Sequence, residues 1–330
     1  MTSIPYVSED YECHSAEEAL LCLAENGVAI LPDILTPEEC TDFHRGVWEG
    51  MEHITADFET PLRRDDPTTW SQFWKLSPKH SMLLQQWQVG HLQAVWDIRQ
   101  NPKVVQTFAE LWDVEQEDLI TSMDGISLHL PSEQTGRGWA RPNKNALHCD
   151  QGFTNSQLQT IQGWVTALDV NDGDATLTFL RGSHHHHARL AEQFRDPLLT
   201  DRKNWNILTP EMIQYCTEEC GCPQECIQCP AGSLVLWDSR TIHCGREPSK
   251  GREESNERCI AYVCMAPRAK ATERMLVKRR KAFAERRMTG HHPYVPILFP
   301  KHPRTYGEPL PKVRDVPEPQ LTDIGESLLA

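Results

Sequence analysis

The triplet His148-Cys149-Asp150 combines residue types and a spacing that suit metal chemistry. In an extended segment, residues i and i+2 point to the same side, so His148 and Asp150 could both reach one metal ion. His243, which follows the strand-like run GSLVLWD, is the strongest candidate for a second imidazole. Two imidazoles and one carboxylate on one face leave adjacent coordination positions open, as in sites that use iron(II) and dioxygen. We therefore predict that these three residues bind iron.

The first 117 residues, which lead up to these positions, are predicted to be mainly helical. Residues 16–26 form an amphipathic pattern that ends at Gly27, and the short strand-like run VAILP follows. A second helix is expected from about residue 37 to 54, capped by Thr36 with Pro37 in its first turn. A third should follow Asn101.

From residue 118 to 267, short apolar runs alternate with turn residues. The runs are LITSM, GISLHLP, IQGWVTALDV, ATLTFL, GSLVLWD and CIAYVCMAP. This pattern favours a sandwich or barrel over a fold of alternating helices and parallel strands. A hairpin around Asn171–Asp174 is the clearest local prediction.

Several runs in order resemble the phytanoyl-CoA dioxygenase family: NGVAILPDILTPEEC, LHCDQGFTN, IQGWVTALDVNDGDATLTFLRGSHHHH, CPAGSLVLWDSRTIHCG and ERCIAYVCMAP. The resemblance implies an α+β fold with a mainly β core: a double-stranded β-helix (a cupin-like jelly roll) with flanking N-terminal helices. We expect a single dioxygenase domain over 1–330. Residues 1–117 are its helical part, 118–267 its β-helix core, and 268–330 a basic helix and Pro-rich extension.

The resemblance also implies roles for residues that bind 2-oxoglutarate, the cosubstrate of this family. Arg258, at the start of CIAYVCMAP, is expected to hold the far carboxylate, because a guanidinium can bind a carboxylate through two parallel hydrogen bonds. Arg252 is the alternative, since the loop before Arg258 is longer than usual. Trp164 matches an aromatic residue that borders the cosubstrate, and His129 lies where relatives carry a polar contact.

The implied reaction needs iron(II), 2-oxoglutarate and dioxygen. It oxidises an unactivated C–H bond of a small molecule, most often by hydroxylation, and converts 2-oxoglutarate into succinate and CO2. Two alternatives stay open: a catalytically silent barrel that binds metal and 2-oxoglutarate, and a nucleic-acid-modifying dioxygenase. A cupin-type zinc or manganese enzyme is a third, which Arg258 disfavours.

Two positions depart from the usual family pattern. Cys149 replaces a Gln inside the triplet, and its side chain should point away from the metal. Gly245 stands where a Ser can bind 2-oxoglutarate, so one hydrogen bond is expected to be missing. Asp150 excludes the halogenase variant, in which a small residue replaces the carboxylate.

Two further clusters could bind metal. In the run 181–187, we expect His184 to be structural and His185–His187 to face solvent. A structural zinc site is conceivable in a second cluster but is not favoured, because its spacing lacks paired C-x2-C motifs; its members are Cys216, Cys220, Cys222, Cys226 and Cys229.

The formal net charge is −14, which disfavours a nucleic-acid partner. The basic helix at 268–287 is expected to be a solvated face. No signal peptide or membrane span is evident, and the scattered cysteines favour a reduced, cytoplasmic protein. Arg137, Arg141 and Lys144, in the loop 131–145, could meet an anionic substrate. The substrate and the oligomeric state cannot be read from the sequence.

Overall fold

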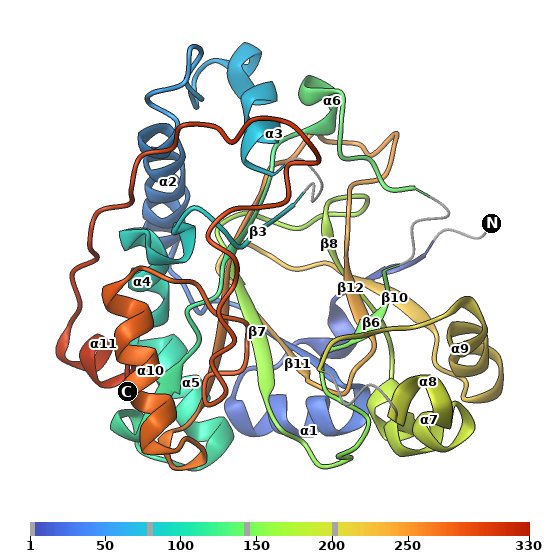
Figure 1. Ribbon diagram of the computed structural model, residues 1–330. Coiled ribbons are helices and arrows are strands. Elements are labelled where there is room, and N and C mark those ends of the chain that lie inside the picture. Colours follow the sequence, from blue (N-terminus) through green and yellow to red (C-terminus); the bar gives the residue numbers. More distant parts are fainter. Residues whose placement is uncertain (1–3, 78–81, 142–145, 200–203) are drawn as a thin grey trace.

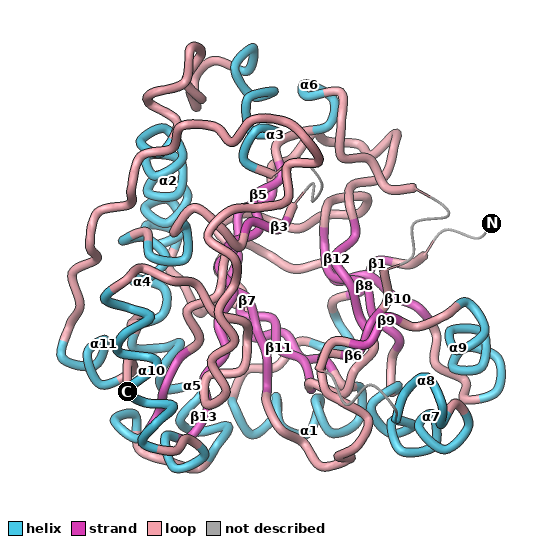
Figure 2. Tube along the Cα trace, in the orientation of Figure 1, coloured by secondary structure: helices cyan, strands magenta, loops and turns pink. Residues whose placement is uncertain are grey.

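Two β-sheets form the centre of the computed structural model, which describes residues 4–77, 82–141, 146–199 and 204–330 (Figures 1 and 2). The six-stranded sheet has the order β1 (Tyr6–Val7), β10 (Gln224–Ile227), β8 (Thr176–Leu180), β12 (His243–Arg246), β6 (His148–Cys149) and β9 (Asn206–Ile207). The seven-stranded sheet has the order β2 (Val28–Leu31), β11 (Leu234–Asp238), β7 (Ile161–Thr166), β13 (Arg258–Pro267), β5 (Ile126–His129) and β3 (Leu83–Leu84), with β4 (Leu119–Thr121) beside β13.

From β5 onward the chain passes repeatedly between the two sheets. Strands β5, β7, β11 and β13 belong to the seven-stranded sheet, whereas β6, β8, β10 and β12 belong to the six-stranded one. Neighbours in each set pair antiparallel. This alternation is the double-stranded β-helix that was expected. It gathers residues far apart in the sequence between the two sheets.

The predicted hairpin around Asn171–Asp174 is wrong, although the turn itself is present. The backbone N–H of Asp174 donates to the carbonyl oxygen of Asn171 at 3.0 Å, and Gly173 has a φ of +83°. The flanking strands do not pair: β7 pairs with β11 and β13, and β8 pairs with β10 and β12. The turn residues determine that the chain reverses direction. They do not determine which strands pair when several apolar strands are available as partners.

The three N-terminal helices predicted from their caps are confirmed. Helix α1 (Ala16–Asn26) ends at Gly27, whose φ is +81°, and α2 (Pro37–Ile54) starts with a capping box between Thr36 and Glu39. The side chain of Asn101 caps α5 (Pro102–Trp112). The first 117 residues also supply β1 to the six-stranded sheet and β2 and β3 to the seven-stranded sheet. The helical part is therefore continuous with both sheets.

Eight further α-helices are present in the described part of the chain. They are α3 (Phe73–Leu76), α4 (Gln93–Arg99), α6 (Ser132–Thr135), α7 (His187–Gln193), α8 (Arg195–Leu199), α9 (Pro210–Gln214), α10 (Glu273–Ala284) and α11 (Asp323–Ser327). Among the described residues, no helix has the length and apolar character that a membrane crossing requires.

Arg279 on α10 corrects the expectation that the basic helix is only a solvated face. Its side chain is fully buried and donates to four backbone carbonyl groups, those of Thr121, Pro293, Leu328 and Leu329. The guanidinium thus ties α10 to the end of the chain. Spacing could not reveal this, because an exposed and a buried Arg look alike within a run of cations.

His187 corrects the expectation that His185–His187 all face solvent. It is 2% exposed, and its ring stacks on Phe153 with 4.3 Å between centroids and 8° between planes. The reason is that His187 opens α7, whose inner face packs onto a small apolar cluster beside β6. His184 is buried and hydrogen-bonded to the carbonyl oxygen of Ala24, as expected of a structural residue.

Burial of His187 predicts a loss of stability in acid. Burial lowers its pKa from 6.5 to about 4, so the unfolded chain binds a proton between these pH values and the folded chain does not. Stability should therefore fall as the pH drops from about 6.5 and level off near 4, by at most about 3 kcal/mol. Denaturant unfolding from pH 7 to pH 4 should show a shallower loss for His187→Phe than for wild type. The exposed control His185→Phe should follow wild type; equal slopes for all three proteins would refute this prediction.

Candidate metal centre

His148, Asp150 and His243 meet at one point in the six-stranded sheet. One ligand atom from each lies within 4.8 Å of the others. The Nε2 atoms of His148 and His243 lie 3.6 and 3.4 Å from the two carboxylate oxygens of Asp150. The sheet accounts for this convergence, because β6 and β12 are antiparallel neighbours in which His148 is registered directly with His243.

Both imidazoles are held with Nε2 directed to the centre. The Nδ1 atom of His148 lies 2.7 Å from the carbonyl oxygen of Ala146, and that of His243 lies 2.9 Å from the carbonyl oxygen of Thr241. A carbonyl oxygen only accepts, so each Nδ1 must carry the proton. The Nε2 lone pairs are therefore free to bind a metal, which is the usual way in which second partners orient histidine ligands.

The charge states also suit a cation. Burial alone would raise the pKa of Asp150, but the surrounding imidazoles, led by His291, hold it well below its ordinary value. Burial lowers the pKa of His148 to about 4. At neutral pH Asp150 is therefore a carboxylate and His148 a neutral imidazole, two donor types that suit iron(II).

The residues next to the ligands lock the local backbone. Cys149 points away from the centre into an apolar cluster, as predicted, and is fully buried. The side chain of Gln151 donates to the carbonyl oxygens of Asn155 and Gln157 and accepts from the hydroxyl of Ser239. These contacts hold the segment that carries Asp150 against the segment that leads to His243.

A third histidine, His291, lies at the centre and was not predicted. Its Nδ1 is 3.8 Å from a carboxylate oxygen of Asp150, and its Nε2 is buried without a hydrogen-bond partner among the described residues. His291 belongs to the C-terminal extension, and hydrogen bonds fix the residues just before it. Thr289 exchanges two hydrogen bonds with Met123, and the backbone N–H of Gly290 donates to the carbonyl oxygen of Ile297. The sequence signal was the pair His291-His292 in a Pro-rich tail, which no spacing tied to the triplet.

Trp205 borders the centre on its solvent side. Its ring centroid is 6.0 Å from that of His148, and 56% of its surface is exposed. The backbone of Trp205 has a φ of +73°, a conformation that is rare for a bulky residue, and its N–H donates to the carbonyl oxygen of Asp150. An exposed indole held in a strained conformation beside a metal ligand suggests a role in substrate contact.

Arg258 is buried in the opposite sheet without an anionic partner. Its guanidinium donates to the hydroxyl of Ser127 at 3.0 Å and the carbonyl oxygen of Ala175 at 2.9 Å, and it lies 5.0 Å from the ring centroid of Trp164. No ion pair with a carboxylate is formed by Arg258 in the described part of the chain. Burying a cation is costly unless it is paired, so Arg258 is suited to bind an anionic ligand.

Arg252, the alternative anchor, is already neutralised. Its guanidinium lies 2.8 Å from Glu133 and 2.7 Å from Asp174. A guanidinium with two carboxylate partners has little to gain from a third anion. The two arginines, which the sequence left open, therefore differ sharply in their electrostatic surroundings.

Three unpaired donors lie on the face of the seven-stranded sheet that carries Trp164. The N–H groups of Trp164, Trp237 and Gln162 are buried and have no partner within the described ranges. Trp237 is registered with Gln162, and its ring is 5.2 Å from that of His243. These donors lie between the metal ligands and Arg258, where an oxygen-rich ligand would satisfy them. Gln162 and Trp237 were missed, although alternation with Trp164 could have indicated the former.

His129 and Gly245 complete the comparison with the predicted contacts. His129 is registered with Arg258 on the neighbouring strand and is buried, and burial lowers its pKa to about 4. It is thus a neutral residue beside the candidate anchor. At Gly245, an added Cβ would lie 2.8 Å from the terminal methyl of Met82. A Ser there would need Met82 to move.

The cysteine cluster is divided between two places. Cys216 and Cys222 belong to the apolar cluster beside β6, whereas Cys226 is on β10. All twelve cysteines of the chain are free thiols. Within the described ranges, the triad is the only group of His, Cys, Asp and Glu side chains close enough to hold a metal. Of the loop cations, Arg137 stacks over Trp74, and Lys144 lies outside the described residues.

Comparison with known proteins places this geometry in context. The family model described as phytanoyl-CoA dioxygenase (PhyH) matches residues 23–251. The "Ava biosynthesis cluster protein O" of Aspergillus versicolor is 26% identical over 275 residues, which cover 81% of this chain and 83% of that protein.

Two solved structures share the fold at low sequence identity. The hypothetical protein JW0805 from Escherichia coli has a TM-score of 0.55 at 16% identity, covering 94% of this chain and 81% of that one. GlcNAc Inducible Gene 2 from Candida albicans has a TM-score of 0.51 at 13% identity, covering 86% and 70%.

Proposed function

Because this chain belongs to the phytanoyl-CoA dioxygenase family, and is therefore an iron- and 2-oxoglutarate-dependent oxygenase, we propose that it hydroxylates an unactivated C–H bond of a small molecule. In this reaction 2-oxoglutarate becomes succinate and CO2. The observation that carries the proposal is the buried group of His148, Asp150 and His243 facing an unpaired Arg258. The three-residue group could hold iron, and Arg258 could hold the far carboxylate of 2-oxoglutarate.

The chain's own residues prepare this site before any ligand arrives. Carbonyl oxygens fix both imidazole tautomers, and burial keeps His148 neutral, so no proton must leave His148 before the metal binds. We assign Arg258 as the carboxylate anchor, with Trp164 bordering the cosubstrate and His129 supporting it. The N–H groups of Gln162 and Trp237 are suited to its remaining oxygens. When bound, iron(II) and 2-oxoglutarate supply the activation of dioxygen; the protein supplies geometry and a dry site.

The substrate side of the centre is proposed to be formed by Trp205 and His291. Trp205 lies beside His148 just before β9, and His291 lies beside Asp150 in the C-terminal extension. The name of the Aspergillus versicolor relative, a biosynthesis cluster protein, supports a small-molecule substrate.

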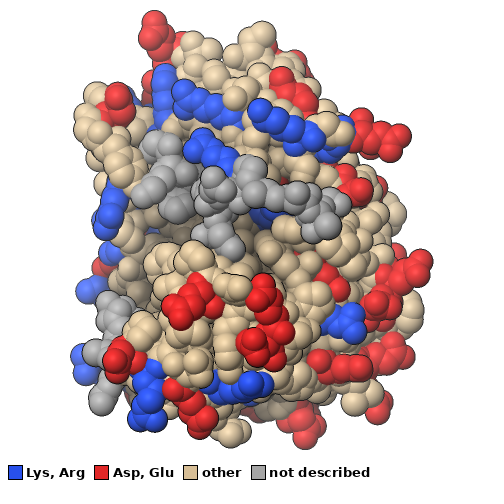
Figure 3. Space-filling view, turned by 90° about the vertical axis from the view of Figure 1, so that its right-hand side faces the viewer, with Lys and Arg blue, Asp and Glu red and all other residues tan. Residues whose placement is uncertain are grey.

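A nucleic-acid substrate is the less favoured candidate. The net charge of −14 repels phosphate, and the buried Arg279 removes one cation from the helix that would have offered a basic surface. The face shown in Figure 3 carries acidic side chains over much of its lower half, with basic ones gathered mainly along the upper part. An affinity for DNA or RNA that falls steeply with salt would revive this alternative.

The proposed reaction can be tested with the iron-loaded enzyme and a library of small natural products. Succinate formation should rise above the background rate only with a true substrate. Under isotopically labelled dioxygen, the product should gain one labelled oxygen atom. A product that has lost two hydrogen atoms would show that the reaction is a desaturation and not a hydroxylation. Absence of succinate under every condition would favour the catalytically silent barrel.

Replacing Trp205 by Ala should weaken substrate binding without changing the metal site. Loss of an aromatic contact should raise the KM for the substrate about tenfold, while the background conversion of 2-oxoglutarate to succinate persists. Steady-state kinetics of both reactions would measure this difference. The exposed Tyr306→Ala variant serves as a control for loss of a surface aromatic. An unchanged KM would remove Trp205 from the substrate site.

A further inference from the structure

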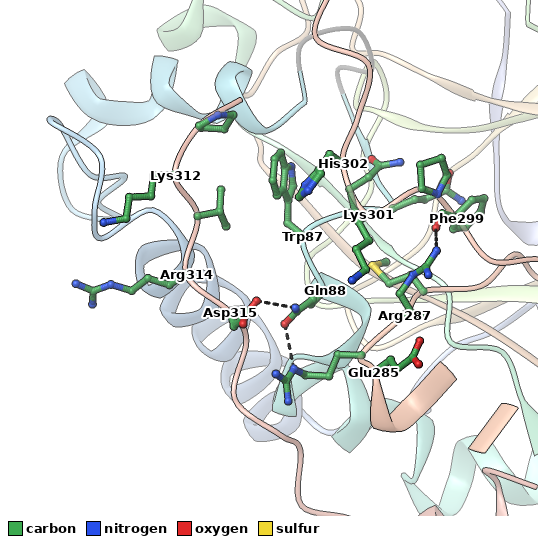
Figure 4. Close-up of a pocket in the computed structure, with 17 residues that line it drawn as sticks. Trp87, Gln88, Glu285, Arg287, Phe299, Lys301, His302, Lys312, Arg314 and Asp315 are labelled. Atoms are coloured by element: carbon green, nitrogen blue, oxygen red, sulfur yellow. Dashed lines mark hydrogen bonds between the residues drawn. The ribbon is translucent and has the colours of Figure 1, made fainter. Parts of the chain in front are cut away.

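A cavity lies away from the metal centre, between the C-terminal extension and the segment before α4. It encloses about 560 Å³, and four stretches of chain line it: 85–88, 285–288, 299–302 and 311–315 (Figure 4). None of the three metal ligands lines this cavity. Its volume falls in the range of small-molecule sites. We call it the basic cavity, for the charge described next.

The lining of the basic cavity is cationic in an acidic protein. Five of its residues are Lys or Arg and two are carboxylates, whereas the whole chain has a formal charge of −14. One cation, Arg314, is already paired with Asp57, and Figure 4 shows it pointing away from Trp87 together with Lys312. The cations that remain at the cavity are Arg286, Arg287 and Lys301.

Neutral oxygen atoms, not carboxylates, hold the two arginines in place. The Nε of Arg286 donates to the side-chain oxygen of Gln88 at 3.1 Å, and a terminal nitrogen of Arg287 donates to the carbonyl oxygen of Phe299 at 2.8 Å. Gln88 is itself oriented by a hydrogen bond to Asp315. Among the described residues, no ion pair within 4.0 Å involves Arg286, Arg287 or Lys301. The charges of Arg286 and Arg287 are therefore held in place by hydrogen bonds and are not compensated by an ion pair.

The backbone of the cavity is held in strained conformations. Trp87, Gln88 and Arg286 have φ values of 60°, 61° and 47°, in the left-handed region that residues with a side chain rarely adopt. The indole N–H of Trp87 donates to the carbonyl oxygen of Leu76, and its ring packs on His302 with 5.1 Å between centroids. Strained residues of this kind gather at ligand-binding sites, where the surrounding contacts maintain them.

We propose that the basic cavity binds a small organic anion with phosphate or carboxylate groups. Arg286, Arg287 and Lys301 bind its anionic groups, because a guanidinium matches both groups in shape and Lys adds a point charge. Trp87 and His302 contact its apolar part. The site is separate from the 2-oxoglutarate site at Arg258.

A short stretch of chain joins the basic cavity to the metal centre. Met288 lines the cavity, and three residues later His291 lies 3.8 Å from Asp150. Thr289, between them, is fixed to Met123 by two hydrogen bonds.

Calorimetric titration of the metal-free protein with pyrophosphate, and separately with citrate, tests the proposal at low ionic strength. Wild type should bind at least one of these probes, and the Arg286→Ala/Lys301→Ala variant should lose about tenfold in affinity or more. The matched control is Arg280→Ala/Lys281→Ala, which removes the same charges from exposed positions on α10 and should change affinity less than twofold. The stronger probe identifies the preferred group.

Lysine acetylation followed by mass spectrometry gives a second readout that needs no variant. The bound probe should protect Lys301 from acetylation and leave the exposed Lys281 unchanged. Absence of binding by both probes would overturn the proposal, as would equal affinity in wild type and the cavity variant. Because metal-free protein is used, these outcomes are independent of whether the iron site functions.

Discussion

The variant His243→Ala should lose the iron site while it keeps the fold. We proposed that this side chain is one of three iron ligands, so its removal should weaken iron(II) binding by more than the 10- to 100-fold that loss of a supporting residue costs. Anaerobic addition of iron(II) and 2-oxoglutarate to wild type should give the weak visible band near ~500 nm of the iron–2-oxoglutarate chelate. The variant should give no band.

His185→Ala is the matched control for this experiment. It removes an exposed imidazole on a short helix outside the centre and should leave the band unchanged. Circular dichroism should show that both variants are folded. A wild-type protein that is folded and gives no band would refute the assignment of the metal ligands, and a band that persists in His243→Ala would point to another histidine, with His291 the nearest candidate.

The second large effect is expected from Arg258→Met. The substitution removes a buried cation with no carboxylate partner, so the folded protein should lose little stability. Binding of 2-oxoglutarate should weaken by at least about 30-fold, because its far carboxylate would be left buried and unpaired. Titration of 2-oxoglutarate into the iron-loaded protein, followed by the same visible band, measures this loss.

Arg279→Met provides the contrasting control, since it also replaces a buried guanidinium. That side chain satisfies four backbone carbonyl oxygens, and their loss should lower the free energy of unfolding by about 3 kcal/mol or more. Denaturant unfolding of the two variants should therefore separate a ligand-binding arginine from a structural one. If Arg258→Met binds 2-oxoglutarate normally, the anchor lies elsewhere; the paired Arg252 would then be tested in the same way.

Much of the local structure could be predicted because it depends on neighbouring residues. Ser15 and Thr36 cap the helices that follow them through side-chain hydrogen bonds within three residues. The i and i+2 spacing of His148 and Asp150 places both side chains on one face of an extended segment, whatever the rest of the fold. These features, together with the order of the motifs, were sufficient for the fold class and the candidate metal ligands.

Contacts between distant segments decided the rest. The turn at Asn171–Asp174 is encoded locally, but the pairing of its strands depends on which apolar partners pack best, and these lie far away in sequence. Likewise, His291 is chemically indistinguishable in the sequence from other histidines in the chain. Its place beside Asp150 depends on the course of the C-terminal extension.

The two candidate anchors, Arg252 and Arg258, show most clearly which features the sequence determines and which depend on the tertiary structure. The sequence determined that an arginine stands near the start of the last long strand, and it left Arg252 and Arg258 as alternatives. Only the tertiary structure distinguished them, because the charge available to a ligand depends on neighbours in space. Glu133 and Asp174 neutralise Arg252, whereas Arg258 is buried against a hydroxyl, a carbonyl oxygen and an indole.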